Sequence, residues 1–229
     1  GHRFAYQSGI RQDGDKYALL VQPPDAASAR KGSLALLVEG GGEHPSLSDE
    51  ACRIALETIS RVYYEDNARS ITSSLRNAIE AANSAVLEHC YKRDTGMAAG
   101  AEPSAVAIQT GGSRARGVRV GLTAALFRPD GTGVYLSQLA PTQAYIVHNG
   151  MVNPLPEPKG WRIEAEGEEG EPIAFPPAQS LGSQPGLVPD LAFRRIEPGD
   201  RLVLVSQSLA RILDRPLAEA MLGGENGAA

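Results

Sequence analysis

The sequence predicts an α+β fold, in which helices pack against antiparallel sheets. Short apolar runs bounded by Gly, Pro, Asn and Asp indicate strands in the first 40 residues and again after residue 117. Between these two groups lie two stretches with helical spacing of apolar residues, 46–66 and 70–91. Strands and helices that are grouped in this way, instead of alternating along the chain, are typical of α+β proteins.

Composition limits the kinds of partner. The chain of 229 residues is 42% hydrophobic and 21% charged, as is usual for a globular protein, and its net charge of −5 gives no general attraction to nucleic acid or to anionic membranes. No apolar run approaches membrane-spanning length. Cys52 and Cys90 fall within helical patterns, so we expect buried free thiols in a reduced, cytoplasmic setting.

Two short strands are expected at the start of the chain, over 4–7 and 17–22. The loop between them carries Arg11, Asp13 and Asp15 beside glycines, which is typical of a tight turn. The same loop offers one or two carboxylates and one guanidinium group for binding.

The next stretch, from Leu34 to His44, is central to the chain. Its apolar part, 34–38, predicts a buried strand. Glu39 ends that strand, and the glycines behind it allow close approach of the backbone and offer carbonyl oxygens, which hard cations accept as ligands. A strand that runs into a turn with a solvated Glu39 explains the same residues, and this stretch alone favours that simpler interpretation.

The two helices follow directly. Ser46 or Ser48 is expected to cap the first, with Asp49 and Glu50 in its first turn. The link to the second helix is short, so the two should pack side by side and antiparallel.

The second half of the chain reads as strands with irregular stretches. An antiparallel meander is expected over 118–127, 133–139 and 143–148, with a strong hairpin signal at Asn149-Gly150. A second hairpin should join 192–196 to 201–206 through the turn at 197–200, followed by helices near 207–213 and 216–222. Residues 92–117 and 155–180 have few apolar anchors and are expected to be the most mobile.

Six short motifs follow one another along the chain: V-E-G-G-G-E-H at 38–44, A-I-E-A-A-N at 78–83, G-L-T-A-A-L-F at 121–127, L-A-P-T-Q-A-Y-I at 139–146, S-L-G at 180–182 and E-P-G-D-R-L-V-L-V-S-Q-S-L at 197–209. Together, in this order, they resemble the metal-dependent PP2C (PPM) family of protein serine/threonine phosphatases. The resemblance implies a four-layer α-β-β-α sandwich of two facing antiparallel sheets with helices outside. It also implies a single domain over 1–229, in which the family's C-terminal helix and closing strand are missing.

The family holds two Mg²⁺ or Mn²⁺ ions that bind phosphate and activate a water molecule. The positions that the resemblance implies are Glu39, Gly40, Gln207 and Asp13 or Asp15 for the metal, with Arg11 on the phosphate. Three family aspartates are replaced, by Glu39, by Gln207 and by Pro141. Since two dications bring four positive charges, this set of ligands leaves most of that charge unbalanced.

Two functions follow from the resemblance. The first is a catalytically weak or inactive phosphatase-like domain, a pseudophosphatase that binds a phosphorylated protein or signalling partner and contacts neither nucleic acid nor membrane. The second is a divergent, active Mg²⁺- or Mn²⁺-dependent phosphatase with one metal ion, held by Glu39, an N-terminal Asp and Gln207. The charge count favours the first. An α+β domain unrelated to the family is a third interpretation, which the ordered motifs oppose.

Overall fold

The structure, a computed structural model, describes residues 4–7, 10–13, 17–21, 28–41, 45–68, 70–95, 118–139, 142–155, 179–206 and 209–210. The helical elements in these ranges are a short 3-10 helix, η1 (Ser28–Lys31), and two long helices, α1 (Pro45–Glu65) and α2 (Ile71–Thr95). The strands are β1 (Phe4–Gln7), β2 (Ile10–Asp13), β3 (Ala18–Val21), β4 (Ser33–Gly41), β5 (Arg119–Phe127), β6 (Gly133–Leu139), β7 (Gln143–His148), β8 (Met151–Leu155), β9 (Ala192–Arg195) and β10 (Arg201–Val205).

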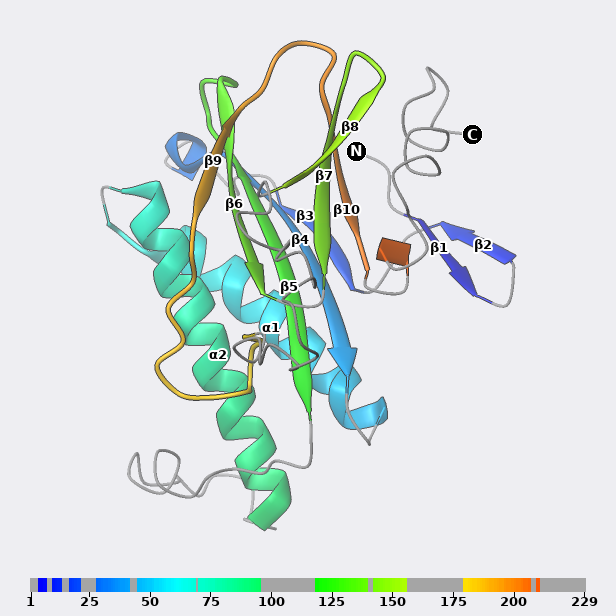
Figure 1. The fold of residues 1–229 in the computed structure, drawn as a ribbon. Helices are drawn as coiled ribbons and strands as arrows, with labels where there is room; N and C mark the ends of the chain where they lie inside the picture. Colours follow the sequence, from blue (N-terminus) through cyan, green and yellow to red (C-terminus); the bar gives the residue numbers. More distant parts are fainter. Residues whose placement is uncertain are drawn as a thin grey trace, which may run out of the picture.

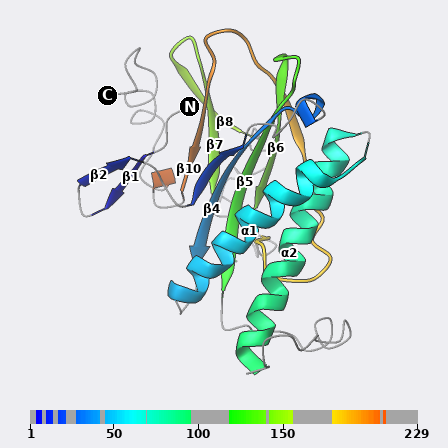
Figure 2. The same cartoon turned by 180° about the vertical axis from the view of Figure 1, so that it is seen from behind.

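Two antiparallel sheets form the body of the molecule. The larger has the strand order β3-β4-β5-β6-β9 and the smaller the order β10-β7-β8, while β1 and β2 pair with each other. Both helices cover the outer face of the larger sheet, and the smaller sheet lies on its other face (Figures 1 and 2). The predicted α+β fold of two facing antiparallel sheets, with the two helices together on one outer side, is confirmed.

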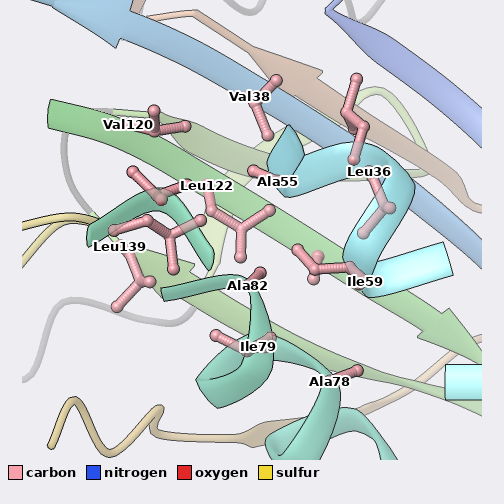
Figure 3. Packing of buried hydrophobic residues seen from close by; sticks show 14 of the residues in the cluster. Leu36, Val38, Ala55, Ile59, Ala78, Ile79, Ala82, Val120, Leu122 and Leu139 are labelled. Carbon is pink, nitrogen blue, oxygen red and sulfur yellow. The ribbon is translucent and has the colours of Figure 1, made fainter. Parts of the chain in front are cut away.

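The helices are held to the sheet by one continuous apolar cluster. Figure 3 shows Ile59 of α1 and Ile79 of α2 on the helix side of the sheet residues Leu36 and Leu122, and all four side chains are buried. The apolar spacing of both helices therefore predicted the buried face correctly. Within the described ranges, neither helix is long and apolar enough to cross a membrane.

Strand β4 shows how the two faces of the larger sheet differ. Side chains alternate along a strand, so Leu34, Leu36 and Val38 face the helices and belong to their cluster. Ala35 faces the other way and packs against a second cluster, which joins the two sheets through Ala125, Val134, Leu136, Ala144, Ile146 and Leu155. Odd-numbered residues of β4 therefore face the space between the sheets.

Several local predictions were wrong at the start of the chain. Arg11 and Asp13 lie on β2, not in a loop, and pair with Tyr6 and Phe4 of β1. Helix α1 begins at Pro45, so Ser46 and Ser48 lie inside it and cannot cap it, and its first turn has no acidic residue. Pro is well suited to the first position of a helix because its missing N–H would have no partner there.

Two predicted strand pairings were also wrong, for one common reason. Strands β6 and β7 do not continue a meander, and β9 and β10 do not form a hairpin, because each pair divides between the two sheets. The turn at 197–200 does form, with the Asp200 N–H donating to the Glu197 carbonyl at 3.0 Å. It carries the chain from one sheet to the other.

The hairpin signal at Asn149-Gly150 is confirmed. Both residues have positive φ, 48° and 78°, as a two-residue turn of this kind requires. The turn joins β7 to β8, a strand that the sequence did not predict because 151–155 contains Pro154 and continues into a Pro-rich stretch. Mobility was predicted for 92–117 and 155–180. Of these, residues 92–95 belong to α2, Leu155 belongs to β8 and Ser180 is buried, while 96–117 and 156–178 lie outside the described residues. Nearly all of the helices predicted after 206 lie outside them as well.

Candidate functional site at the end of strand β4

The end of β4 lies at the same end of the sandwich as several other strand ends. The register pairs Gly41 with Arg119 at the start of β5, and Leu122 with Leu139 at the end of β6. Gln143 at the start of β7 pairs with Val205 at the end of β10. In Figure 1, the arrowheads of β4, β6 and β10 accordingly point toward the same end. We call this the Glu39 end, made of Glu39, Gly121, Thr123, Gln138 and Thr142.

Glu39 and Gly40 face opposite sides of β4. Glu39 is half-buried and, as an odd-numbered residue, faces the space between the sheets, with Gly121 as its neighbour on β5. Gly40 faces α1, where an added Cβ would lie 2.9 Å from Ser48 Cβ and 3.0 Å from Cys52 Sγ. Position 40 therefore requires glycine because the helix packs directly against it. The motif thus places a carboxylate on the face toward the second sheet, and on the opposite face it lets α1 pack against the backbone of β4.

The space between the sheets changes from apolar to polar toward the Glu39 end. Ala125 and Leu136 pair at the apolar level, and one step along each strand on the same face Thr123 pairs with Gln138. Thr123 is fully buried, and its hydroxyl donates to Thr142 Oγ1 at 2.8 Å. Thr142 directly precedes β7, so this hydrogen bond links the two sheets.

The Gln138 side chain is the unexpected member of this polar group. Its Nε2 atom is buried and has no hydrogen-bond partner among the residues that the structure describes. Sequence reasoning did not single out Gln138, Thr123 or Thr142. The alternation of side chains along β6, which places Gln138 on the same face as Leu136, could have identified Gln138 once the inward face was known.

Carboxylates are scarce on the strands that the structure describes. Strands β3 to β10 contain a single acidic residue, Glu39. Asp13 lies on β2, which in the described part of the chain pairs with β1 only, beside Arg11. Asp15, Pro141 and Gln207 lie outside the described residues. Over the described ranges, no group of three or more His, Cys, Asp or Glu side chains could hold a metal ion.

The donors that the structure places at the Glu39 end do not fit two dications. One carboxylate and neutral hydroxyl and amide groups leave most of four positive charges unbalanced in a half-buried site. The predicted convergence of Gln207 and of Asp13 or Asp15 on Glu39 stays a prediction.

Two of the family-like motifs meet away from this site. The Asn83 side chain accepts a hydrogen bond from the Gly182 N–H and donates one to the Gln184 carbonyl, both at 2.9 Å. Leu181 is buried and exchanges two backbone hydrogen bonds with Val120, at 3.0 and 2.8 Å. These motifs therefore fix the segment 180–184 between α2 and β5, which is a structural role.

The opposite end of the sandwich holds a hydrogen bond between the side chains of His148 and Asp200. His148 Nδ1 lies 2.6 Å from Asp200 Oδ1, and the Glu197 N–H donates to Asp200 Oδ2 at 2.8 Å. Burial raises the pKa of Asp200, but the Glu197 N–H and His148 outweigh burial and leave the pKa below its usual value. This pair joins the sheet-crossing turn to the end of β7.

Comparison with known proteins rests on structure. No protein-family model and no curated protein sequence matches the chain. The Mycobacterium tuberculosis serine/threonine phosphatase PstP/Ppp superposes with a TM-score of 0.61 and 18% identity, over 97% of this chain and 83% of that one. A second PstP structure, of the catalytic domain in complex with two manganese ions, superposes with a TM-score of 0.60 and 18% identity, over 92% of this chain and 85% of that one. The S. agalactiae serine/threonine phosphatase superposes with a TM-score of 0.61 and 17% identity, over 94% of this chain and 83% of that one.

These similarities, together with the two facing antiparallel sheets and the helical pair, show that the chain has the PP2C-like fold of the PPM serine/threonine phosphatases.

Proposed function

We propose that this chain is a phosphatase-like domain that binds phosphorylated serine or threonine in a partner protein and has little or no phosphatase activity of its own. The partner would be a phosphoprotein of a signalling system. The observation that carries the proposal is that strands β3 to β10 contain a single carboxylate, Glu39, which lies at the Glu39 end of the sandwich.

Electrostatics gives the physical reason. A two-metal centre works by balancing its positive charge with several carboxylates, so that phosphate and an activated water can bind between the ions. Glu39 contributes one negative charge, and Gly121, Thr123 and Thr142 at the same end of the sandwich contribute none. A site of this composition lacks much of the negative charge that would hold two ions, while it has hydrogen-bond donors that suit a phosphate group.

The second candidate function is slow, metal-dependent phosphatase activity. The half-buried Glu39, with residues outside the described ranges such as Asp15 and Gln207, would hold one Mg²⁺ or Mn²⁺ ion and support slow hydrolysis. The manganese ions of the PstP structure favour this alternative by analogy of fold.

The experiment compares binding with turnover on the full chain. Fluorescence anisotropy measures binding of a labelled phosphothreonine peptide and of the same peptide without phosphate, and release of aryl alcohol from an aryl phosphate with excess Mn²⁺ measures hydrolysis. We expect phosphate-dependent binding and almost no hydrolysis. Efficient Mn²⁺-dependent hydrolysis that Glu39→Ala abolishes would establish the alternative, and equal binding of the two peptides would rule out phosphate recognition.

A further inference from the structure

The buried amide of Gln138 requires an explanation. Buried donors in folded proteins almost always have a partner, and one without a partner costs stability. Gln138 Nε2 is buried and lacks a partner among the described residues, although it lies beside Thr123, whose own hydroxyl is hydrogen-bonded to Thr142. A buried donor without a partner in the protein is suited to donate a hydrogen bond to a bound ligand.

The register shows where such a group would sit. Gly121 is the neighbour of Glu39 on β5, and Thr123, two residues further along the same face, is the neighbour of Gln138 on β6. Gly121 lies on β5, between the strand that carries the carboxylate, β4, and the strand that carries the amide, β6, and it adds no side chain there. An anion is repelled by Glu39 and is therefore favoured on the β6 side of Gly121.

Neutral donors gather on that side. Besides the Gln138 amide, the Thr142 hydroxyl is available, because its contact with the Leu139 carbonyl is 3.5 Å long, at the limit of a hydrogen bond. Hydrogen bonds from neutral donors to an ionised phosphate are among the stronger ones in proteins, and they require no metal ion.

We infer that the Gln138 side-chain amide donates a hydrogen bond to a phosphate oxygen of the ligand bound at the Glu39 end, with the Thr142 hydroxyl beside it. This inference rests on the proposed function, since it names a residue that recognises the phosphate group. It requires no metal ion for that contact.

The test uses Gln138→Met in the full chain, which keeps the length of the side chain and removes the donor. The control is the same substitution at Gln184, whose side chain is exposed in the segment 180–184. Isothermal titration calorimetry with inorganic phosphate, in buffer with EDTA and again with Mn²⁺, gives the dissociation constants. We expect about tenfold weaker binding for Gln138→Met in both buffers, the loss typical of one hydrogen bond to a charged group, and no change for Gln184→Met.

A second readout separates recognition from a structural role. Without phosphate, Gln138→Met should raise the melting temperature, because it removes a buried donor that has no partner. A lower melting temperature would show that Gln138 serves an internal hydrogen bond and would overturn the inference. Unchanged phosphate binding in Gln138→Met would overturn the inference alone, leaving the proposed function in place. A wild-type chain that binds neither phosphate nor the phosphothreonine peptide would overturn both.

Discussion

Neighbouring residues of β4 meet different surroundings on the two faces of the larger sheet. Leu36 faces the helices, where the apolar cluster runs without interruption from β4 through α1 and α2 (Figure 3). Leu37 faces the other sheet, at the level where the lining changes to Thr123 and Gln138. The helical face is apolar throughout and contributes stability, whereas the face between the sheets is apolar at one end and polar at the other.

The largest effect should distinguish these two leucines. Leu36→Ala removes a side chain that is 1% exposed in the main cluster and should cost about 2–5 kcal/mol of unfolding free energy. Leu37→Ala, at 7% exposure and outside both of the principal clusters, should cost clearly less. Urea denaturation of the two variants and the wild type measures the difference. Equal losses would show that the two faces contribute alike.

Lys31 extends the comparison to the edge of the helical face. Its buried ammonium group donates to the Tyr63 carbonyl at 2.5 Å, to the Asp66 carbonyl and to Ser74 Oγ at 3.3 Å, and so satisfies carbonyls at the end of α1. Lys31→Met should leave these acceptors without a donor and cost about 1–3 kcal/mol in denaturation at pH 7. A stability equal to that of the wild type would show that water satisfies those carbonyls as well as the lysine does.

The pH dependence of that loss has a definite sign. Burial lowers the pKa of Lys31, and Asp66 offsets this only in part. Between this lowered pKa and the unfolded value of about 10.4, the unfolded chain binds more protons, so the contribution of Lys31 grows as pH rises. The stability difference between wild type and Lys31→Met should therefore widen between about pH 7 and about pH 9.5, below the range of tyrosine ionisation. A difference that narrows would contradict the lowered pKa.

A smaller effect is expected at the end of the sandwich opposite Glu39. The pKa of Asp200 lies below its usual value, so the ionised carboxylate stabilises the fold above the unfolded pKa of about 3.9, and this contribution is lost as pH falls through the folded value. Asp200→Asn should cost about 1 kcal/mol near pH 6 and make stability less sensitive to acid below about pH 4. Thermal denaturation from pH 3 to pH 6 provides the measurement; an acid sensitivity equal to that of the wild type would assign the effect to other carboxylates.

The sequence predicted those parts of the molecule that local patterns determine. The strands at 133–139 and 143–148, both helices within a few residues, and the turn at Asn149-Gly150 follow from periodicity and turn chemistry. Local patterns do not determine which sheet a strand joins, because the turn at 197–200 has the same residues whether it closes a hairpin or crosses between sheets.

The candidate site was predictable to a lesser degree. Glu39 and Gly40 stand out because they follow an apolar run, and their opposite orientations follow from strand alternation. The hydrogen bond between Thr123 and Thr142 joins residues of two sheets, and the isolated amide of Gln138 results from the packing around it. Such long-range contacts leave no local pattern, so sequence reasoning missed them.

Metal binding tests the central claim most directly, that the face between the sheets has lost the charge needed for a two-metal centre. The full chain, freed of metal with a chelator and then dialysed, is titrated with Mn²⁺ by isothermal titration calorimetry, with Glu39→Ala titrated in parallel. We expect at most one weak site, which Glu39→Ala removes. Two tight Mn²⁺ ions per chain in the wild type would contradict the claim and would identify the Glu39 end as a rearranged, working metal centre.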